Sequence, residues 1–168
     1  VYITAGRSIL DIERHPEYLA KNKDGSYKNT LYQDIHNDDE PIPEGAWQHL
    51  CMSNPHYLKE IYNITEEVCQ RYEMLDGLFY DICFIGGPCY CDECIKGMKE
   101  RGLDPENDED AQKYYDDTHY EFMIKIRQIL DKNNPDATLF FNSGGANIYA
   151  PHILPYETHY EIEDLPTA

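Results

Sequence analysis

The stretch from Asp76 to Cys94 constrains the fold most, because it joins an apolar run to three closely spaced cysteines. The run covers residues 77–85 and is closed by Gly86-Gly87-Pro88, so it predicts a buried strand rather than a helix. Asp81 is the single acid in the run, and a buried carboxylate is costly unless it is paired or used. Active sites of α/β barrels form at the carboxyl ends of strands. The stretch therefore predicts a catalytic carboxylate and a metal site beside one strand end.

Apolar periodicity along the rest of the chain predicts alternating strands and helices. Further strands are expected over residues 1–5, 138–141 and 158–162. Helices are expected over residues 53–72, 92–101 and from the acidic run after Pro105 to Asn133. The strands are apolar rather than cleanly alternating, as in a parallel sheet covered by helices. An open doubly wound sheet and a (β/α)8 TIM barrel both fit, and acids at the strand ends favour the barrel.

The length of 168 residues suits one domain, yet the chain begins inside a predicted strand and stops just after another. We expect residues 1–168 to be a fragment of a single barrel, with its middle strands and helices. Residues 7–49 are polar and turn-rich and are expected to lack regular structure. Their aromatic residues either fix this segment to the surface or form a rim that stacks on sugar rings; they are Tyr18, Tyr27, Tyr32 and Trp47.

The formal net charge of −18 and the pI near 4.5 narrow the classes of partner. Charge of this sign repels nucleic acid and anionic membranes, so neither is expected as a partner. A neutral ligand fits, although charge of this size also serves solubility alone. The sequence shows no signal peptide and no apolar run of membrane length, which favours a cytoplasmic protein.

Cys89, Cys91 and Cys94 form a C-x-C-x-x-C cluster directly after the predicted strand. Cysteines this close indicate metal binding rather than a disulfide framework. Zinc prefers four ligands, and Cys51 is the best fourth, because the helix after it leads back to the Asp81 strand. Four thiolates close the coordination sphere, so we expect a structural zinc that catalysis does not need. The alternative is a set of reduced thiols without metal.

A second group of polar candidates lies at the end of the chain. His159, Glu161 and Glu163 are two residues apart, so on a strand they share one face. Together with Asp81 they supply the two carboxylates that glycosidic bond cleavage needs. The structural alternatives are a solvent-facing edge strand for the glutamates and an ion pair or helix cap for Asp81.

The motifs resemble two groups of glycoside hydrolases. LCMSNPHYLKE and CYCDEC are similar to the family 42 β-galactosidases, in which such cysteines hold structural zinc. A closer resemblance is to the hypothetical glycosyl hydrolase group that includes the family 151 α-L-fucosidases. It rests on HPEY, KDGSY, DGLFYDI, CYCDECIKGMKERGLDPE and THYEIEDLPT. In the related family 29 fucosidases the nucleophile is an aspartate at the end of strand four, which corresponds to Asp81.

The resemblance implies a retaining glycoside hydrolase, and it favours an α-L-fucosidase that acts on oligosaccharides or glycans. Asp81 is then the nucleophile, and Glu161 or Glu163 is the acid/base. The expected substrate-binding residues are Trp47, Asn142 and His159. The full-length enzyme is expected to be a homo-oligomer, because such enzymes continue into a trimerisation domain. The alternatives are a β-galactosidase-like glycosidase and a non-catalytic, zinc-stabilised carbohydrate-binding scaffold.

Overall fold

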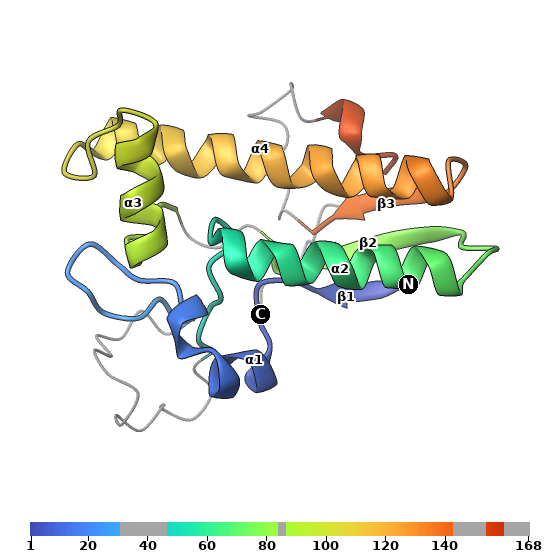
Figure 1. Ribbon diagram of the computed structural model, residues 1–168, viewed down its shortest axis with the longest axis horizontal. Coiled ribbons are helices and arrows are strands. Elements are labelled where there is room, and N and C mark those ends of the chain that lie inside the picture. The colour runs from blue at the N-terminus through green and yellow to red at the C-terminus, as the bar shows by residue number, and fades with distance from the viewer. Residues whose placement is uncertain (31–46, 84–86, 143–153, 160–168) are drawn as a thin grey trace, which may run out of the picture.

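The computed structural model describes residues 1–30, 47–83, 87–142 and 154–159 of the chain. Strands and helices alternate along it (Figure 1). Their bounds are β1 Tyr2–Thr4, α1 Ile9–Arg14, η1 Pro16–Tyr18, α2 Pro55–Arg71, β2 Gly77–Asp81, α3 Asp92–Glu100, α4 Asp108–Asn133, β3 Thr138–Phe141 and η3 Leu154–Tyr156. The predicted strands over 1–5 and 138–141 and all three predicted helices are confirmed.

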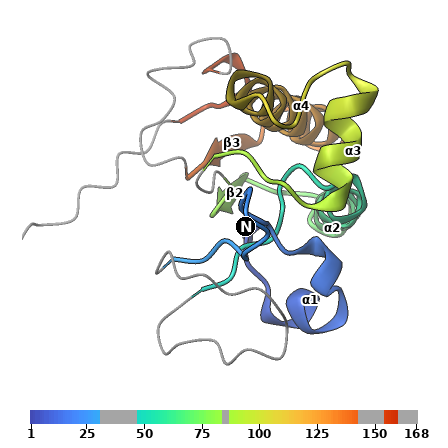
Figure 2. The same ribbon diagram turned by 90° about the vertical axis from the view of Figure 1, so that its left-hand side faces the viewer.

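The three strands form one parallel sheet in the order β1-β2-β3. Tyr2 lies opposite Phe79, and Phe79 lies opposite Phe140, so these three residues share one face of the sheet. The helix α2 connects β1 to β2, and α4 precedes β3. Both long helices lie on the same side of the sheet (Figure 2). Consecutive strands are therefore neighbours, with their crossover helices on one side, as in the repeating unit of a (β/α) barrel.

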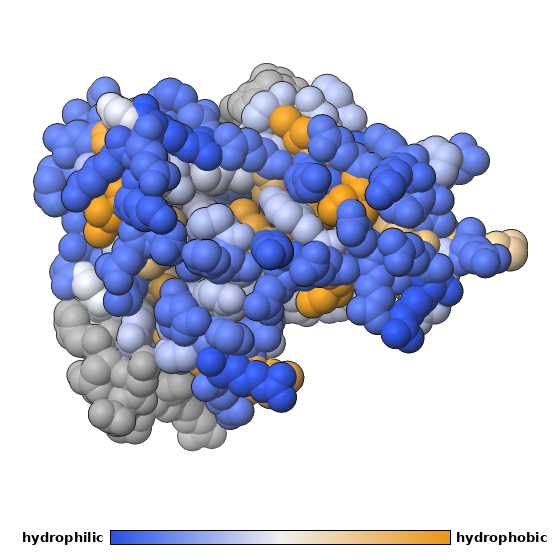
Figure 3. All heavy atoms as spheres, in the orientation of Figure 1, coloured by the Kyte–Doolittle hydropathy of each residue, from blue (hydrophilic) through white to orange (hydrophobic). Residues whose placement is uncertain are grey.

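The main core lies between the sheet and these two helices. The sheet contributes alternate residues, Leu78, Tyr80, Leu139 and Phe141, which are all fully buried. Tyr80 also bonds through its hydroxyl to that of Thr65 on α2 (2.5 Å). The surface on the side viewed in Figure 1 is mostly hydrophilic (Figure 3). Among the described residues, no helix is both long and apolar enough to span a bilayer.

The opposite face of the sheet carries an aromatic row. The ring centroids of Tyr2 and Phe79 are 5.1 Å apart, and those of Phe79 and Phe140 are 4.1 Å apart. Tyr2 is 57% exposed, and no helix of the described residues covers this row. The strands read as continuously apolar because aromatic residues fill this second face, and not because helices cover both faces. In a closed barrel this face points inward.

Local signals in the sequence explain where the helices begin and end. The Asn54 side chain caps α2 by accepting a bond from the His56 amide (2.9 Å). Asn107 caps α4 by accepting from the Glu109 amide (2.8 Å), and acidic residues in the first turn suit the helix dipole. After α3, Gly102 has a φ of 72°, a conformation that favours glycine at a helix end.

The predicted strand over 77–85 is too long, because β2 ends at Asp81. Ile82 has a φ of 57°, which takes it out of the extended region and stops the ladder. Residues 84–86 lie outside the described part of the chain. Asp81 is therefore the last residue of its strand rather than a residue inside it.

The prediction that residues 7–49 lack regular structure is wrong for their described part. The Ser8 hydroxyl caps α1 by accepting from the Asp11 amide (3.2 Å). Isolated antiparallel bridges then join Leu19 to Leu50, Lys21 to Tyr27 and Asn29 to Gln48. Tyr18 and Tyr27 are buried, so they fix the segment to the fold and do not form a rim. Tyr32 lies outside the described residues.

The predicted strand over 158–162 is described only at its first two positions. Thr158 and His159 are not in a strand. Thr158 nevertheless lies along the edge of β3: its amide donates to the Leu139 carbonyl (2.7 Å), and its hydroxyl accepts from the Leu139 amide (2.7 Å). The chain after β3 thus returns to the edge where a further strand would pair.

Candidate functional site

Asp81 ends β2, so its half-buried carboxylate lies at the carboxyl edge of the sheet. Its Oδ1 accepts bonds from the Asn142 side chain (2.8 Å) and from the Ile82 amide (3.0 Å). Its Oδ2 accepts a bond from the Tyr2 hydroxyl, which raises the pKa of the Tyr2 phenol. Within the described residues Asp81 forms no ion pair and caps no helix, so neither structural alternative is found there. The three hydrogen bonds fix the orientation of a carboxylate that is still partly exposed.

Ile82 holds a backbone conformation that β-branched residues rarely adopt, with a φ of 57°. Such a conformation costs on the order of 1–3 kcal/mol and persists where the surrounding structure imposes it, often at functional sites. The amide of the same residue donates to the Asp81 carboxylate. The strained residue therefore belongs to the arrangement that holds Asp81.

Sequence reasoning missed Tyr2, which supplies the third hydrogen bond to Asp81. The sheet register explains the contact. Tyr2 lies two residues before Thr4, which pairs with Asp81, so its side chain is on the same face and is long enough to reach the carboxylate. The position of Tyr2 in the first strand could have indicated this contact, but only if the pairing of that strand with the Asp81 strand were known.

Of the three predicted substrate-binding residues, Asn142 contacts Asp81, while Trp47 and His159 lie elsewhere. Asn142 lies directly after β3 and contacts Asp81, so this pair is brought together. Trp47 is 41% exposed, and the Arg7 guanidinium lies 3.8 Å from its ring centroid, near the end of β1. His159 bonds to the Thr158 hydroxyl (2.9 Å), beside Leu139 rather than at the carboxyl end of β3. The predicted acid/base residues Glu161 and Glu163 lie outside the described residues.

The four predicted metal ligands converge. The sulfur atoms of Cys51, Cys89, Cys91 and Cys94 all lie within 4.8 Å of one another. The Cys51 sulfur is 3.4 Å from that of Cys94 and 3.9 Å from that of Cys91. A tetrahedral ion with metal–sulfur bonds of about 2.3 Å would separate its sulfurs by about 3.8 Å. The four cysteines therefore have the chemistry and the spacing to hold a metal ion.

Local structure brings these cysteines together. Cys51 lies three residues before Asn54, the N-cap of α2, while Cys91 is the N-cap of α3 and Cys94 lies in its first turn. The Cys89 sulfur accepts bonds from the amides of Lys21 (3.3 Å) and Cys91 (3.4 Å). Bonds from the neighbouring thiols, Cys51 first, hold the pKa of Cys89 well below its usual value. The two amide donors favour the thiolate form of Cys89, which is the form that binds a metal ion.

The cysteine cluster forms its own small core, separate from the core of the sheet. All four cysteines are buried, and they pack with Ala20, Met98, Ala111 and Tyr114. The two other cysteines, Cys69 and Cys83, are buried in the main core, as predicted for small apolar residues. The chain therefore uses its cysteines in two distinct ways.

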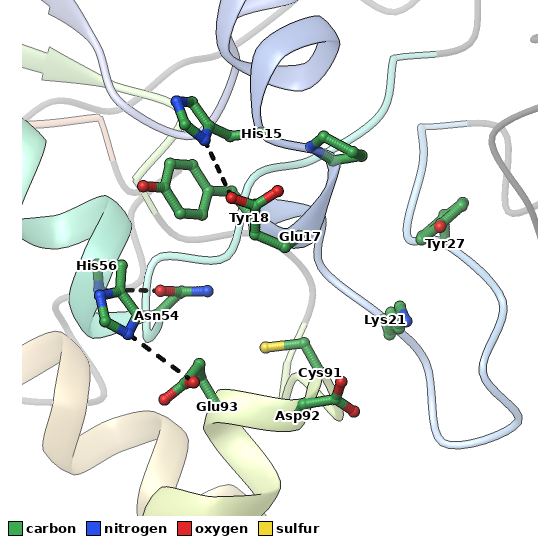
Figure 4. Close-up of a pocket in the computed structure, with 11 residues that line it drawn as sticks. His15, Glu17, Tyr18, Lys21, Tyr27, Asn54, His56, Cys91, Asp92 and Glu93 are labelled. Atoms are coloured by element: carbon green, nitrogen blue, oxygen red, sulfur yellow. Dashed lines mark hydrogen bonds and ion pairs between the residues drawn. The ribbon is translucent and has the colours of Figure 1, made fainter.

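A cavity of about 590 Å³ lies beside Cys91, between η1 and the starts of α2 and α3 (Figure 4). His15 Nδ1 is 3.0 Å from Glu17 Oε1, and His56 Nε2 is 3.8 Å from Glu93 Oε1. Cys91 also lines this cavity, but Asp81 does not. The size is within the range of ligand pockets, yet the cavity is separate from the candidate catalytic carboxylate.

Neither the family models nor the curated proteins compared with this chain gave a match. Among solved structures, the chain is similar to α-L-fucosidase isoenzyme 2 from Paenibacillus thiaminolyticus. The two share 26% identity with a TM-score of 0.78, over 99% of this chain and 23% of that one. A β-galactosidase from Rahnella sp. R3 is 15% identical, with a TM-score of 0.59, over 83% of this chain and 25% of that one. A GH42 β-galactosidase from G. stearothermophilus is 15% identical, with a TM-score of 0.58, over 84% and 25%.

The chain spans between 23% and 25% of the length of these enzymes. The two β-galactosidases show likeness of fold alone, and the fucosidase adds identity along nearly the whole chain. The predicted resemblance to glycosidases is supported at this level. The chain has a glycoside-hydrolase-like fold, with the Asp81 carboxylate and the four-cysteine cluster at separate places on it.

Proposed function

We propose that this chain is part of a retaining glycoside hydrolase that acts on α-L-fucosides of oligosaccharides or glycans. The observation that carries the proposal is the Asp81 carboxylate, held by Asn142, Tyr2 and the Ile82 amide at the carboxyl edge of a parallel sheet. The 26% identity with an α-L-fucosidase over 99% of the chain supports the choice of sugar. A homo-oligomeric, cytoplasmic full-length enzyme remains a prediction.

Residues 1–168 are, in this proposal, a fragment of a single (β/α)8 barrel. The strand order β1-β2-β3 and the position of both long helices on one side of the sheet support this (Figure 2). A doubly wound sheet would place helices on both faces. The aromatic row of Tyr2, Phe79 and Phe140 then belongs to the barrel interior. Further strands would complete the sheet beyond β1 and β3.

Asp81 is the proposed nucleophile. Its carboxylate attacks the anomeric carbon while Glu161 or Glu163 protonates the leaving oxygen, which gives a covalent glycosyl-enzyme. The same glutamate then removes a proton from water, which displaces the sugar from Asp81. Asn142 and Tyr2 keep the carboxylate in a fixed orientation, which lowers the cost of reaching the attacking geometry. Trp47 and His159 are the further proposed contacts to the sugar.

The four-cysteine cluster is the proposed site of a structural zinc. Cys51, Cys89, Cys91 and Cys94 would hold it, and their spacing fits a tetrahedral ion. Four protein ligands leave no position for substrate or water, so the ion would fix the chain and take no part in catalysis. It would join the segment before α2 to the start of α3.

The test is the variant Asp81→Ala in the complete enzyme, assayed with an aryl α-L-fucoside. Loss of the nucleophile should lower kcat on the order of 10⁴-fold or more, while the fold is kept. Azide should restore part of the activity by entering the vacated space, and the product should be a fucosyl azide of inverted configuration. Asp76→Ala, an exposed aspartate just before β2, is the matched control and should keep full activity.

The outcomes separate the proposal from its rivals. Full activity of Asp81→Ala would remove the nucleophile assignment. Turnover of an aryl β-galactoside in place of the α-L-fucoside would point to a β-galactosidase-like enzyme. Binding of sugars without turnover of either would point to a non-catalytic scaffold. Glu161→Ala and Glu163→Ala then identify the acid/base, because its loss affects substrates with poor leaving groups most.

A further inference from the structure

We propose that Lys28 is the counter-charge of the four-cysteine cluster and determines how tightly the cluster holds a divalent metal ion. The inference rests on the proposed zinc site but concerns a residue outside the four ligands. Lys28 has no role in the catalytic proposal above, and its place in the fold is unusual for a lysine. It is buried, at 8% exposure, whereas lysine side chains are usually exposed at the surface.

The backbone fixes Lys28 in the interior. Its amide donates to the Ala20 carbonyl (2.8 Å), and its carbonyl accepts from the His49 amide (3.1 Å). Lys28 is thus held between two other segments of the chain, one of which leads directly into Cys51. Its ammonium nitrogen donates to the Gly87 carbonyl (2.9 Å), two residues before Cys89. The side chain therefore reaches from one ligand-bearing segment to the other.

Lys28 and the cluster line the same small cavity. The residues around it include Cys51, Cys89 and Lys28, with Tyr115 and His119 from α4. Burial lowers the pKa of Lys28, and the nearby thiols of Cys89, Cys51 and Cys94 act in the opposite direction. The lysine and the thiols are therefore close enough to affect each other's charge, in an interior where that interaction is little screened.

The charge of a loaded cluster explains why a cation belongs there. Four thiolates and one divalent ion would carry two excess negative charges in a buried place, which is costly without compensation. The amides of Lys21 and Cys91 compensate part of this negative charge by donating to the Cys89 sulfur. The start of α3 adds a fraction of a positive charge, because Cys94 lies in its first turn. Lys28 supplies a full charge on the side of Cys51 and Cys89.

The experiment measures metal affinity rather than activity. Zn²⁺ is titrated into the purified, reduced protein in competition with a chromophoric chelator, and Co²⁺ reports tetrahedral thiolate coordination by its absorption bands. Lys28→Met removes the charge and keeps the length. Lys28→Gln also removes the charge but keeps a donor for the Gly87 carbonyl. The matched control is Lys99→Met, which removes the charge of an exposed lysine near the end of α3.

Both neutral variants should bind zinc 10- to 100-fold more weakly than the wild type, as is usual when the groups around a metal site are changed. Lys28→Arg should recover most of the affinity, and Lys99→Met should bind like the wild type. Should Lys28→Met fail to fold, Lys28→Gln decides. Equal affinity of Lys28→Gln and the wild type overturns the inference. A wild-type protein that takes up no metal with all four thiols reduced overturns the zinc site itself, which is a different result.

Discussion

The cysteine cluster and the Asp81 strand end are both built from polar or reactive side chains near the end of β2, yet they are organised in opposite ways. The cluster is closed: its four sulfurs are buried and contact one another inside a small apolar core. The Asp81 carboxylate is half-exposed, is held by Asn142 and Tyr2, and is followed by a strained residue. In the cluster the four thiols contact one another, whereas at the strand end the Asp81 carboxylate is held in one orientation and stays accessible.

The difference teaches which property to test at each place. A closed cluster contributes to the free energy of folding, so changes there should appear in stability and metal content. In the proposed function the open, oriented carboxylate contributes to reaction rate, so changes around it should appear in kinetics and leave stability almost unaltered. A change in the cluster that alters only kinetics, or a change beside Asp81 that alters mainly stability, would contradict this distinction.

The largest effect is expected from Cys89→Ser, which removes one of the four proposed metal ligands. Metal binding free energy in structural sites is folding free energy, so the free energy of unfolding should fall by about 4 kcal/mol or more. Chemical denaturation with measured zinc content checks this. Cys69→Ser, in a buried thiol of the main core, is the control and should keep its metal. Equal metal content and equal stability in the two variants would contradict a structural metal site.

The next largest effect on stability is expected from His119. Burial of its ring lowers its pKa from 6.5 to about 4. Folded His119 stays neutral, while the unfolded chain takes up a proton below pH 6.5. Its contribution to stability is therefore complete above pH 6.5 and is lost as the pH falls toward 4, on the order of 3 kcal/mol in all. The ring bonds to the Tyr115 carbonyl (2.7 Å), which favours the charged form, but burial has the larger effect and keeps the ring neutral.

His119→Gln should remove most of this loss. The measurement is the free energy of unfolding at pH 7 and at pH 4.5 for the wild type and the variant. His56→Gln is the matched control, since His56 is exposed and should keep the wild-type dependence. The same loss between these pH values in His119→Gln would show that other groups cause the acid sensitivity.

A smaller effect is expected from Gly97→Ala, on the cluster side of the comparison. An added Cβ would collide with the hydroxyl of the buried Tyr114, where α3 packs on α4. Overpacking of this kind costs about 2 kcal/mol, and Cys94 on α3 should shift with the helix. Thermal unfolding and zinc content together check this. Lys96→Ala, one residue earlier on α3, should change neither, and identical results for the two variants would show that Tyr114 simply moves aside.

Most of the cysteine site could be predicted from the sequence, because it depends on local spacing and chain order. Cys89, Cys91 and Cys94 lie close together in the chain, and the helix after Cys51 returns to the same strand. The helix boundaries were predictable for the same reason: caps such as Asn54 and Asn107 act within a few residues. Local chemistry needs no knowledge of the tertiary fold.

The environment of Asp81 depends on long-range register and was only partly predictable. That Tyr2 reaches Asp81 follows from the pairing of β1 with β2, which no local pattern encodes. The apolar run past Asp81 predicts a longer strand, and only the tertiary structure imposes the left-handed conformation of Ile82. The burial of Lys28 likewise results from bridges between distant segments. Lysine is usually exposed, so the sequence alone argues against it.

The smallest effect is expected from Tyr2→Phe, which removes one hydrogen bond from the Asp81 carboxylate and little else. Hydrogen bonds to charged groups are worth about 1.5–3 kcal/mol, and this exposed tyrosine should lie at the lower end. We expect kcat to fall about 10-fold, equivalent to about 1.4 kcal/mol, with KM and the unfolding temperature nearly unchanged. Steady-state kinetics on the aryl α-L-fucoside, with thermal unfolding beside it, checks both halves.

A second readout shows whether Tyr2 acts through Asp81, the proposed nucleophile. A 2-deoxy-2-fluoro fucosyl fluoride labels the nucleophile covalently, and mass spectrometry follows the rate of labelling of Asp81. Tyr2→Phe should slow this labelling about as much as it lowers kcat, because both depend on the orientation of the same carboxylate. Tyr72→Phe, a tyrosine of similar exposure at the end of α2, should change neither rate. Unaltered labelling in Tyr2→Phe, with Asp81→Ala inactive, would mean that Asn142 and the Ile82 amide orient the carboxylate without Tyr2.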